Sequence, residues 1–155
     1  MQTRQPVCTG RGFTLVEIMI VVVIIGLLAA IAIPALQRVQ RRTQATRFIS
    51  DLRTFAQAFD TYALENGVWP GNAGSGVVPP GMSDQISTTA WTATNTLGGR
   101  WNWDENRFGV VASVSTTGVT APVADMLAID AQIDDGDLAT GRFRSASGRY
   151  LWVLE

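Results

Sequence analysis

Apolar residues are concentrated in one long run near the start of the printed sequence. Positions 18–37 are twenty consecutive residues without a charge. Together with residues 13–17, where Glu17 is the one charge, the run can cross a hydrocarbon layer of roughly 30 Å at about 1.5 Å per helical residue. A soluble domain of this length could hardly enclose a helix that is apolar on every side. We therefore predict a membrane-spanning helix over residues 13–36.

A polar helical segment continues directly from this run. Residues 37–66 contain neither glycine nor proline, and from Phe48 onward apolar side chains recur every three or four positions. This spacing predicts an amphipathic helix with one buried stripe. Asn66 and Gly67 supply a left-handed stop, and Pro70 prevents the helix from resuming.

Gly26 and Pro34 are the only helix breakers before that stop, and we expect the helix to bend there without ending. The nearest alternative is a cleaved secretory signal, because Arg4 and Arg11 form a short basic region before the apolar run. The run is longer than a typical signal core, and no small-residue cleavage site follows it in a polar context. We therefore expect the apolar segment to stay in the protein.

The remaining residues, 67–155, predict a small β-rich head. In chain order we expect a surface excursion, a hairpin, a short amphipathic helix and a second hairpin. These elements cover residues 70–99 (with a helical turn near 83–86), 100–115 (with a turn at 104–106), 122–133 and 142–155. All five tryptophans lie in this head, and we interpret them as core residues of a sheet packed on the helix stripe, in preference to a ligand platform. The fold class is thus α+β, a long N-terminal helix packed against a small antiparallel sheet.

Composition removes several kinds of chemistry. The net charge is −1, which gives no electrostatic case for nucleic-acid binding. The sequence has no lysine and no histidine, so a Schiff-base lysine, a histidine general base, a Ser-His-Asp triad and a histidine-ligated zinc site are all excluded. The single cysteine, Cys8, cannot form an internal disulfide. We expect no enzyme.

The junction before the apolar run, residues 11–19, reads RGFTLVEIM. It resembles the processing and methylation motif of type IV prepilins and type II secretion pseudopilins, and the resemblance extends over residues 11–36. It implies that residues 1–12 are a leader, that a membrane-bound prepilin peptidase cuts between Gly12 and Phe13, and that the new amine of Phe13 is methylated. It also implies a pilin-like fold and a filament of identical or related pilin subunits, built on an inner-membrane assembly platform.

Glu17 places an ionisable group close to the hydrocarbon, where an unpaired charge costs several kcal/mol. We hypothesise that it pairs with the Phe13 amine of its own or a neighbouring subunit and so supports subunit assembly. In the alternative, Glu17 lies at the headgroup boundary and reaches water.

Arginines are denser after the apolar run than before it, so the positive-inside rule alone predicts a cytoplasmic head. The resemblance instead implies a single-pass protein of the bacterial inner membrane with its head in the periplasm or outside the cell, and we follow it. We interpret the later arginines as contacts to lipid headgroups, or as partners of Asp51 and Asp60 on neighbouring subunits. They are Arg38, Arg41, Arg42 and Arg47.

Acidic residues are densest between positions 125 and 137. Among related proteins, type IVa pilins usually close a C-terminal loop with a disulfide and the major pseudopilin uses calcium, so the resemblance suggests a structural Ca²⁺ here. The spacing does not match an EF-hand, and residues 133–137 are also ordinary helix-stop and turn chemistry. Both interpretations stay open, and no other cofactor is expected. The calcium candidates are Asp130, Asp134, Asp135 and Asp137, with Asp125 nearby.

These observations favour a filament subunit, in the first place a type II secretion pseudopilin. Residues 62–70 support this choice, because a tyrosine, an Asn-Gly stop and an aromatic-Pro pair resemble the helix exit of secretion pseudopilins. A surface type IV pilin for adhesion, motility or DNA uptake is the near alternative. A membrane-anchored binding module that does not polymerise is a third reading, and a tethered hydrolase with an aspartate pair is disfavoured by the missing His and Lys.

Overall fold

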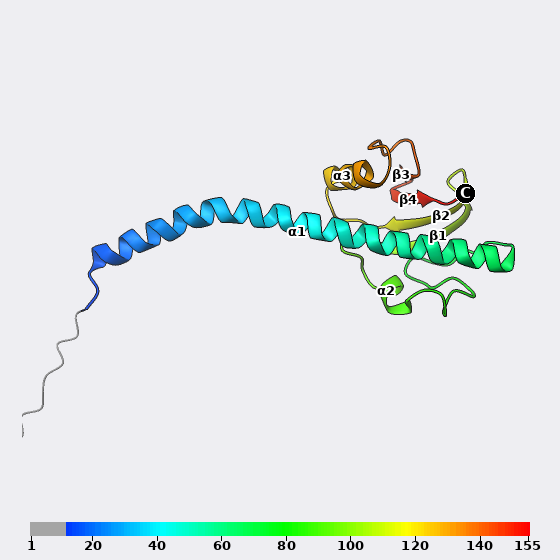
Figure 1. The fold of residues 1–155 in the computed structure, drawn as a ribbon, viewed down its shortest axis with the longest axis horizontal. Coiled ribbons are helices and arrows are strands. Elements are labelled where there is room, and N and C mark those ends of the chain that lie inside the picture. Colours follow the sequence, from blue (N-terminus) through cyan, green and yellow to red (C-terminus); the bar gives the residue numbers. More distant parts are fainter. Residues whose placement is uncertain (1–11) are drawn as a thin grey trace, which may run out of the picture. The chain divides into compact units, whose positions relative to one another are not determined.

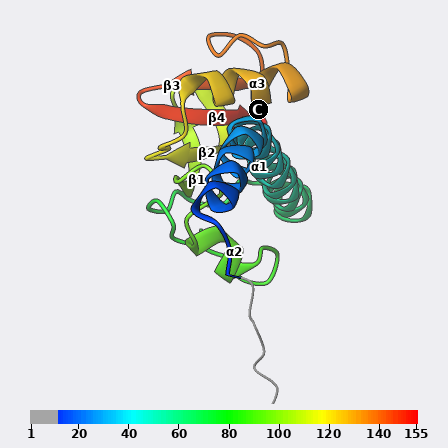
Figure 2. The same cartoon turned by 90° about the vertical axis from the view of Figure 1, so that its left-hand side faces the viewer.

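A computed structural model describes residues 12–155, and Figures 1 and 2 show its fold. The elements combine one long helix, two short helices and one sheet, which is the predicted α+β class. The chain divides into two compact units, and the division falls inside the long helix, between Val39 and Gln40. The elements are α1 (Leu15–Asn66), α2 (Thr88–Thr92), β1 (Arg100–Arg107), β2 (Val110–Thr117), α3 (Val123–Ile133), β3 (Phe143–Ala146) and β4 (Arg149–Val153).

In the first unit, α1 is apolar and exposed on all sides. Its large hydrophobic side chains from Leu15 to Leu36 are at least 46% exposed. The helix is long and apolar enough to span a membrane, and none of its most apolar stretch is buried. Pro34 lies inside the helix, so the proline does not end it.

In the second unit, four antiparallel strands form a sheet in the order β1-β2-β4-β3. The β1-β2 and β3-β4 pairs are the two hairpins that the sequence predicts. Trp103 pairs with Val114, Val114 with Trp152, and Trp152 with Phe143, so these four side chains form one row across a single face. The predicted short helix is also present as α3.

The second half of α1 covers this face of the sheet. The ring of Phe48 stacks on Trp101 with centroids 5.0 Å apart, and Phe59 stacks on Trp103 at 4.0 Å. Trp91, Trp101 and Trp103 are at most 1% exposed, so they fill the core and offer no ligand platform. The helix stripe is therefore covered by the chain's own sheet. Its buried members are Phe48, Ile49, Leu52, Phe55, Ala56 and Phe59.

Residues 70–99 differ from the surface excursion that their composition predicts. Met82, Ile86 and Trp91 are at most 6% exposed and belong to the core. The unpredicted helix α2 begins after Ser87, whose hydroxyl accepts the Ala90 N–H at 3.4 Å. Periodicity cannot find this segment, because its few apolar residues are widely spaced. Figures 1 and 2 show α2 and α3 on opposite sides of the part of α1 in this unit.

The first hairpin turns later than its sequence predicts. β1 runs through residues 104–106, and the turn lies at Phe108 and Gly109, with φ of 57° and 77°. A bulky residue is rare in left-handed backbone. The guanidinium groups of Arg107 and Arg149 lie 5.8 and 5.3 Å from the centre of the Phe108 ring, within the range of cation–π contacts.

Candidate functional site

The predicted cleavage junction lies immediately before α1. Phe13 is 77% exposed, and a side chain built at Gly12 would meet nothing within 4 Å. No described residue covers the bond between Gly12 and Phe13, so this bond is accessible to another protein. The rest of the predicted leader, including Arg4, Cys8 and Arg11, lies outside the described residues.

Thr14 caps the first turn of α1. Its hydroxyl accepts the Glu17 N–H at 3.3 Å, and its carbonyl accepts the Ile18 N–H at 3.4 Å. A threonine followed three positions later by glutamate is the signature of a capping box, a signal in the sequence that our prediction did not use. Glu17 also places negative charge at the positive end of the helix dipole. Among residues 12–155, no ion pair includes Glu17.

Beyond the apolar segment, α1 and α3 enclose a groove of about 450 Å³. Arg41 of α1 forms an ion pair with Asp125 of α3 at 3.3 Å, whereas Arg42 belongs to none of the ion pairs of the described residues. The groove therefore carries an excess of positive charge. Its lining residues are Arg41, Arg42, Ala45, Thr46, Asp125, Ala128 and Gln132.

Asp51 and Asp60, which the sequence suggested as partners for arginines of other subunits, each lie near an arginine of their own chain. Burial raises the pKa of Asp51 above its ordinary value, and the charge of Arg47 opposes this rise. Burial likewise raises the pKa of Asp60, opposed by Arg142. Asp51 is half-buried in the second unit, whereas Asp60 is exposed.

The acidic loop after α3 brings together three of the predicted calcium candidates. Carboxylate oxygens of Asp130, Asp134 and Asp135 all lie within 4.8 Å of one another. Asp137 is not a member of this cluster, and its Oδ1 accepts the Ala139 N–H at 3.0 Å. Asp125 is engaged with Arg41.

Asp130 is the unusual member of the cluster. Its residue surface is fully buried, and neither carboxylate oxygen has a hydrogen-bond partner among the described residues. Burial raises its pKa most, and the nearby charges of Asp135, Asp134 and Asp137 raise it further. The Gly136 N–H, which does not reach hydrogen-bond geometry, opposes the rise in the pKa only in part. Ionised Asp130 would be costly here without a compensating positive charge.

Loop backbone and side-chain groups hold the other two carboxylates. Oδ2 of Asp134 accepts the N–H groups of Arg142 and Phe143. Oδ2 of Asp135 accepts the Thr140 hydroxyl at 2.8 Å, and this bond, after the Asp137 N–H, lowers the pKa of Asp135. This all-oxygen cluster is suited to a shared proton or to a hard cation.

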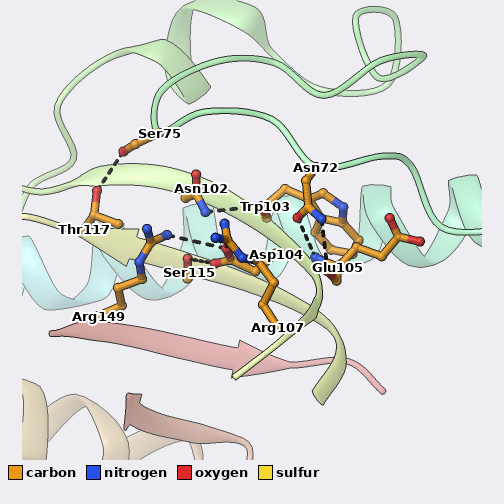
Figure 3. Close-up of polar contacts among 10 residues, drawn as sticks. All are labelled: Asn72, Ser75, Asn102, Trp103, Asp104, Glu105, Arg107, Ser115, Thr117 and Arg149. Atoms are coloured by element: carbon orange, nitrogen blue, oxygen red, sulfur yellow. Dashed lines mark hydrogen bonds and ion pairs between the residues drawn. The ribbon is translucent and has the colours of Figure 1, made fainter. Parts of the chain in front are cut away.

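A second buried carboxylate, Asp104, lies on the face of the sheet turned away from α1 (Figure 3). It accepts the Ser115 hydroxyl at 2.5 Å, and Nη1 atoms of Arg149 and Arg107 lie 3.5 and 3.6 Å from its Oδ1. The sequence placed Asp104 in a turn and so missed this network. The alternation of Trp101 and Trp103 with polar residues, continued into Asp104, was the available signal.

Asn72 closes the free edge of the same sheet, as Figure 3 shows. Its side-chain amide donates to the Glu105 carbonyl at 3.0 Å and accepts the Glu105 N–H at 2.8 Å. Part of the exposed edge of β1 is thereby paired within the chain, which protects it from strand addition by another molecule.

Comparison with known proteins adds independent evidence. Residues 10–33 match the family model of the prokaryotic N-terminal methylation motif. The fimbrial protein EcpC of Eikenella corrodens is 32% identical over 143 residues, which cover 91% of this chain and 87% of that protein.

Other relatives match over shorter stretches. A type IV major pilin protein PilE1 of Neisseria gonorrhoeae is 43% identical over 70 residues, which cover 45% of this chain and 33% of that protein. A fimbrial protein of Pseudomonas aeruginosa is 53% identical over 55 residues, 36% of each chain. No solved structure matches the chain.

Proposed function

The chain belongs to the type IV pilin family. We therefore propose that it is a structural subunit that polymerises into a pilus-like filament. We propose no enzymatic activity for it. One observation carries this proposal: an apolar half-helix, exposed on all sides, is continuous with a head that has its own core. The exposed half-helix and the methylation motif fit a membrane-anchored pilin. In a filament, the same apolar surface would pack against that of other copies.

Processing is the first step of the proposed function. We propose cleavage between Gly12 and Phe13 by a prepilin peptidase, followed by methylation of the Phe13 amine. The motif match over residues 10–33 and the exposed junction support this. Mass spectrometry of protein from assembled material is expected to find methylated Phe13 at the N-terminus. Protein that still begins at Met1 would contradict the proposal.

Glu17 is proposed to form the contact that recruits each new subunit. The cleaved amine of a neighbouring copy is the cation that this carboxylate lacks within residues 12–155. We expect Glu17→Val and Glu17→Gln to insert into the membrane normally but to form few filaments, whereas Leu64→Val, far along the same helix, assembles as the unchanged chain does. Normal filaments from both Glu17 variants would exclude this role.

Two kinds of filament fit this fold. We place the type II secretion pseudopilin first, because the helix exit through Asn66, Gly67 and Pro70 resembles that of secretion pseudopilins. A surface pilin is the alternative, favoured by the fimbrial and pilin names of the relatives. In a gene deletion, lost protein secretion with unchanged surface filaments supports the pseudopilin. Lost surface filaments with unchanged secretion would overturn it.

The head is proposed to lie outside the cytoplasm, with an inner-membrane assembly platform as a partner. The methylation motif supports this topology against the arginine count, because the motif is far more specific than a charge excess. Protease added to spheroplasts is expected to digest the head. A head that is cut only after the membrane is permeabilised would reverse the topology.

We also propose that Ca²⁺ stabilises the acidic loop. The buried, unpartnered oxygens of Asp130 beside Asp134 and Asp135 support a hard cation at this position. Calcium is expected to raise the melting temperature of the unchanged chain relative to chelator, and Asp130→Asn is expected to abolish this rise. Asp137→Asn, with the same charge change outside the cluster, should keep it. If calcium does not change the melting temperature of the unchanged chain, the proposed cation is rejected. A proton on Asp130 would then be what compensates its charge.

A further inference from the structure

The groove between α1 and α3 has the chemistry of an anion site. Arg41 and Arg42 both line it, and only Arg41 is matched by a carboxylate, that of Asp125 at 3.3 Å. The side chain of Arg41 is 58% exposed and that of Asp125 is 25% exposed, so both remain within reach of a ligand. The groove holds one positive charge more than its carboxylate balances. A guanidinium presents paired N–H donors that suit phosphate oxygens.

The two arginines of the groove also follow closely after the apolar segment in the sequence. Arg41 and Arg42 are the fourth and fifth residues after Gln37, the last residue of the uncharged run, in the same unbroken helix. At about 1.5 Å per residue, their backbones lie roughly 6–8 Å past the end of that run. The headgroup layer on each side of a bilayer is about 5–7 Å thick, and arginine side chains extend toward it.

We propose that this groove binds the phosphate of an anionic phospholipid headgroup, with Arg42 as the principal donor and Arg41 as the second. The carboxylate of Asp125 disfavours a bare anion close to Arg41, which leaves Arg42 as the main contact. An additional cationic group on the lipid, as in phosphatidylcholine, would meet the guanidinium groups unfavourably. The inference rests on membrane anchoring and does not depend on filament formation.

A second protein copy is the competing occupant, and the position of the groove favours lipid over it. Any anchored copy brings its own groove to the headgroup layer, where phosphates are already concentrated. A second copy would bring the carboxylate of its own Asp125, but that group is already paired with Arg41 of the same chain at 3.3 Å.

The test uses the full chain in neutral detergent micelles, with a short-chain phosphatidylglycerol and a phosphatidylcholine of the same chain length as probes. Native mass spectrometry measures the bound lipid. We expect phosphatidylglycerol to bind at least about fivefold more tightly, because one guanidinium near a lipid surface contributes about that factor. Arg42→Gln is expected to lower phosphatidylglycerol affinity about fivefold.

The matched control is Arg53→Gln, which removes the same charge from an exposed position of α1 in a different groove. Arg53→Gln should leave lipid binding unchanged. Thermal melting, followed by tryptophan fluorescence, checks that both variants are folded. Competition by inorganic phosphate, absent in Arg42→Gln, would support the phosphate as the recognised group.

Three results would overturn the proposal. They are equal affinity for the two lipids, equal losses in Arg42→Gln and Arg53→Gln, and lipid binding that is unchanged in Arg42→Gln while self-association of the chain is lost. The last result would identify the groove as a contact between copies. Because binding is measured on single chains in micelles, a failure here is separate from a failure to form filaments.

Discussion

Asp104 shows how a single buried charge is accommodated in this head. Its carboxylate is fully buried, and Arg107, Arg149 and Ser115 surround it. Removing the carboxylate leaves the buried Ser115 hydroxyl without its acceptor and takes the counter-charge from Arg149 and Arg107, whose side chains are partly exposed. Asp104→Ala is therefore expected to lower the free energy of unfolding by about 3 kcal/mol.

Chemical denaturation followed by tryptophan fluorescence measures this effect. Ser115→Ala removes one hydrogen bond to the same carboxylate and should lower the unfolding free energy by about 1 kcal/mol. A smaller loss in Asp104→Ala than in Ser115→Ala would mean that the two arginines contribute nothing to folding.

Asp51 is expected to make the stability of the head decrease as the pH rises. Its pKa is raised above 3.8 in the folded chain, chiefly by burial. The folded state therefore binds more protons than the unfolded state between the two pKa values, and stability falls as pH rises through that window. Asp51→Asn removes the penalty, so its melting temperature should exceed that of the unchanged chain at pH 7 but not at pH 3. A lower melting temperature at pH 7 would show that attraction to Arg47 outweighs burial.

Individual residues differ in how far the sequence reveals them. Glu17 stands out because it interrupts an uncharged run, and its proposed role rests on that position, on the prepilin motif and on the lack of an ion pair within residues 12–155. Asp104 was missed because Asp-Glu-Asn is also common turn chemistry, although the alternation through Trp101 and Trp103 continues into it. The contacts with Arg149, 45 residues away, exist only in the folded sheet.

The stacking of α1 on the sheet depends on a few aromatic pairs. Phe59 and Trp103 are fully buried, and their rings lie 4.0 Å apart with an interplanar angle of 4°. Phe59→Ala is expected to lower the free energy of unfolding by about 3–5 kcal/mol, because a large cavity opens between helix and sheet. Leu64→Ala, on the same helix at an 87% exposed position, should change it by less than about 0.5 kcal/mol. Similar losses in both variants, measured by urea denaturation, would contradict this packing.

Elements with strong periodicity were predictable and the others were not. The stripe that starts at Phe48 and the two hairpins follow directly from the spacing of apolar residues. Helix α2 was not predicted, because it has only one buried residue, Trp91, and a single apolar residue shows no helical spacing. The first hairpin was misjudged at its turn, because the turn places the bulky residue Phe108 in left-handed backbone, which residue preferences disfavour.

The division of the chain at Val39 and Gln40 predicts that the head folds without the apolar segment. The residues of the hydrophobic core and those packed against it all lie between Ala45 and Leu154. A fragment that starts at Gln40 is expected to be soluble without detergent and to melt within a few degrees of the full chain. Circular dichroism and gel filtration measure both properties. An unfolded or aggregated fragment would show that the first unit contributes to the head's stability.

The acidic loop after α3 is a candidate site that the sequence predicted only in part. Asp130 and Asp134 are four residues apart at the end of α3, so their proximity was visible in the spacing. The complete burial of Asp130, and the position of Asp137 outside the cluster, could be seen only in the folded loop.

Helix α1 has no break between Leu15 and Asn66, so no flexible linker connects the apolar segment to the head. A pull on the anchor is borne by backbone hydrogen bonds in series, and the helix can lengthen only by unwinding, from about 1.5 to about 3.3 Å per residue. Pro34, which supplies no N–H, is where the first turn should open under load.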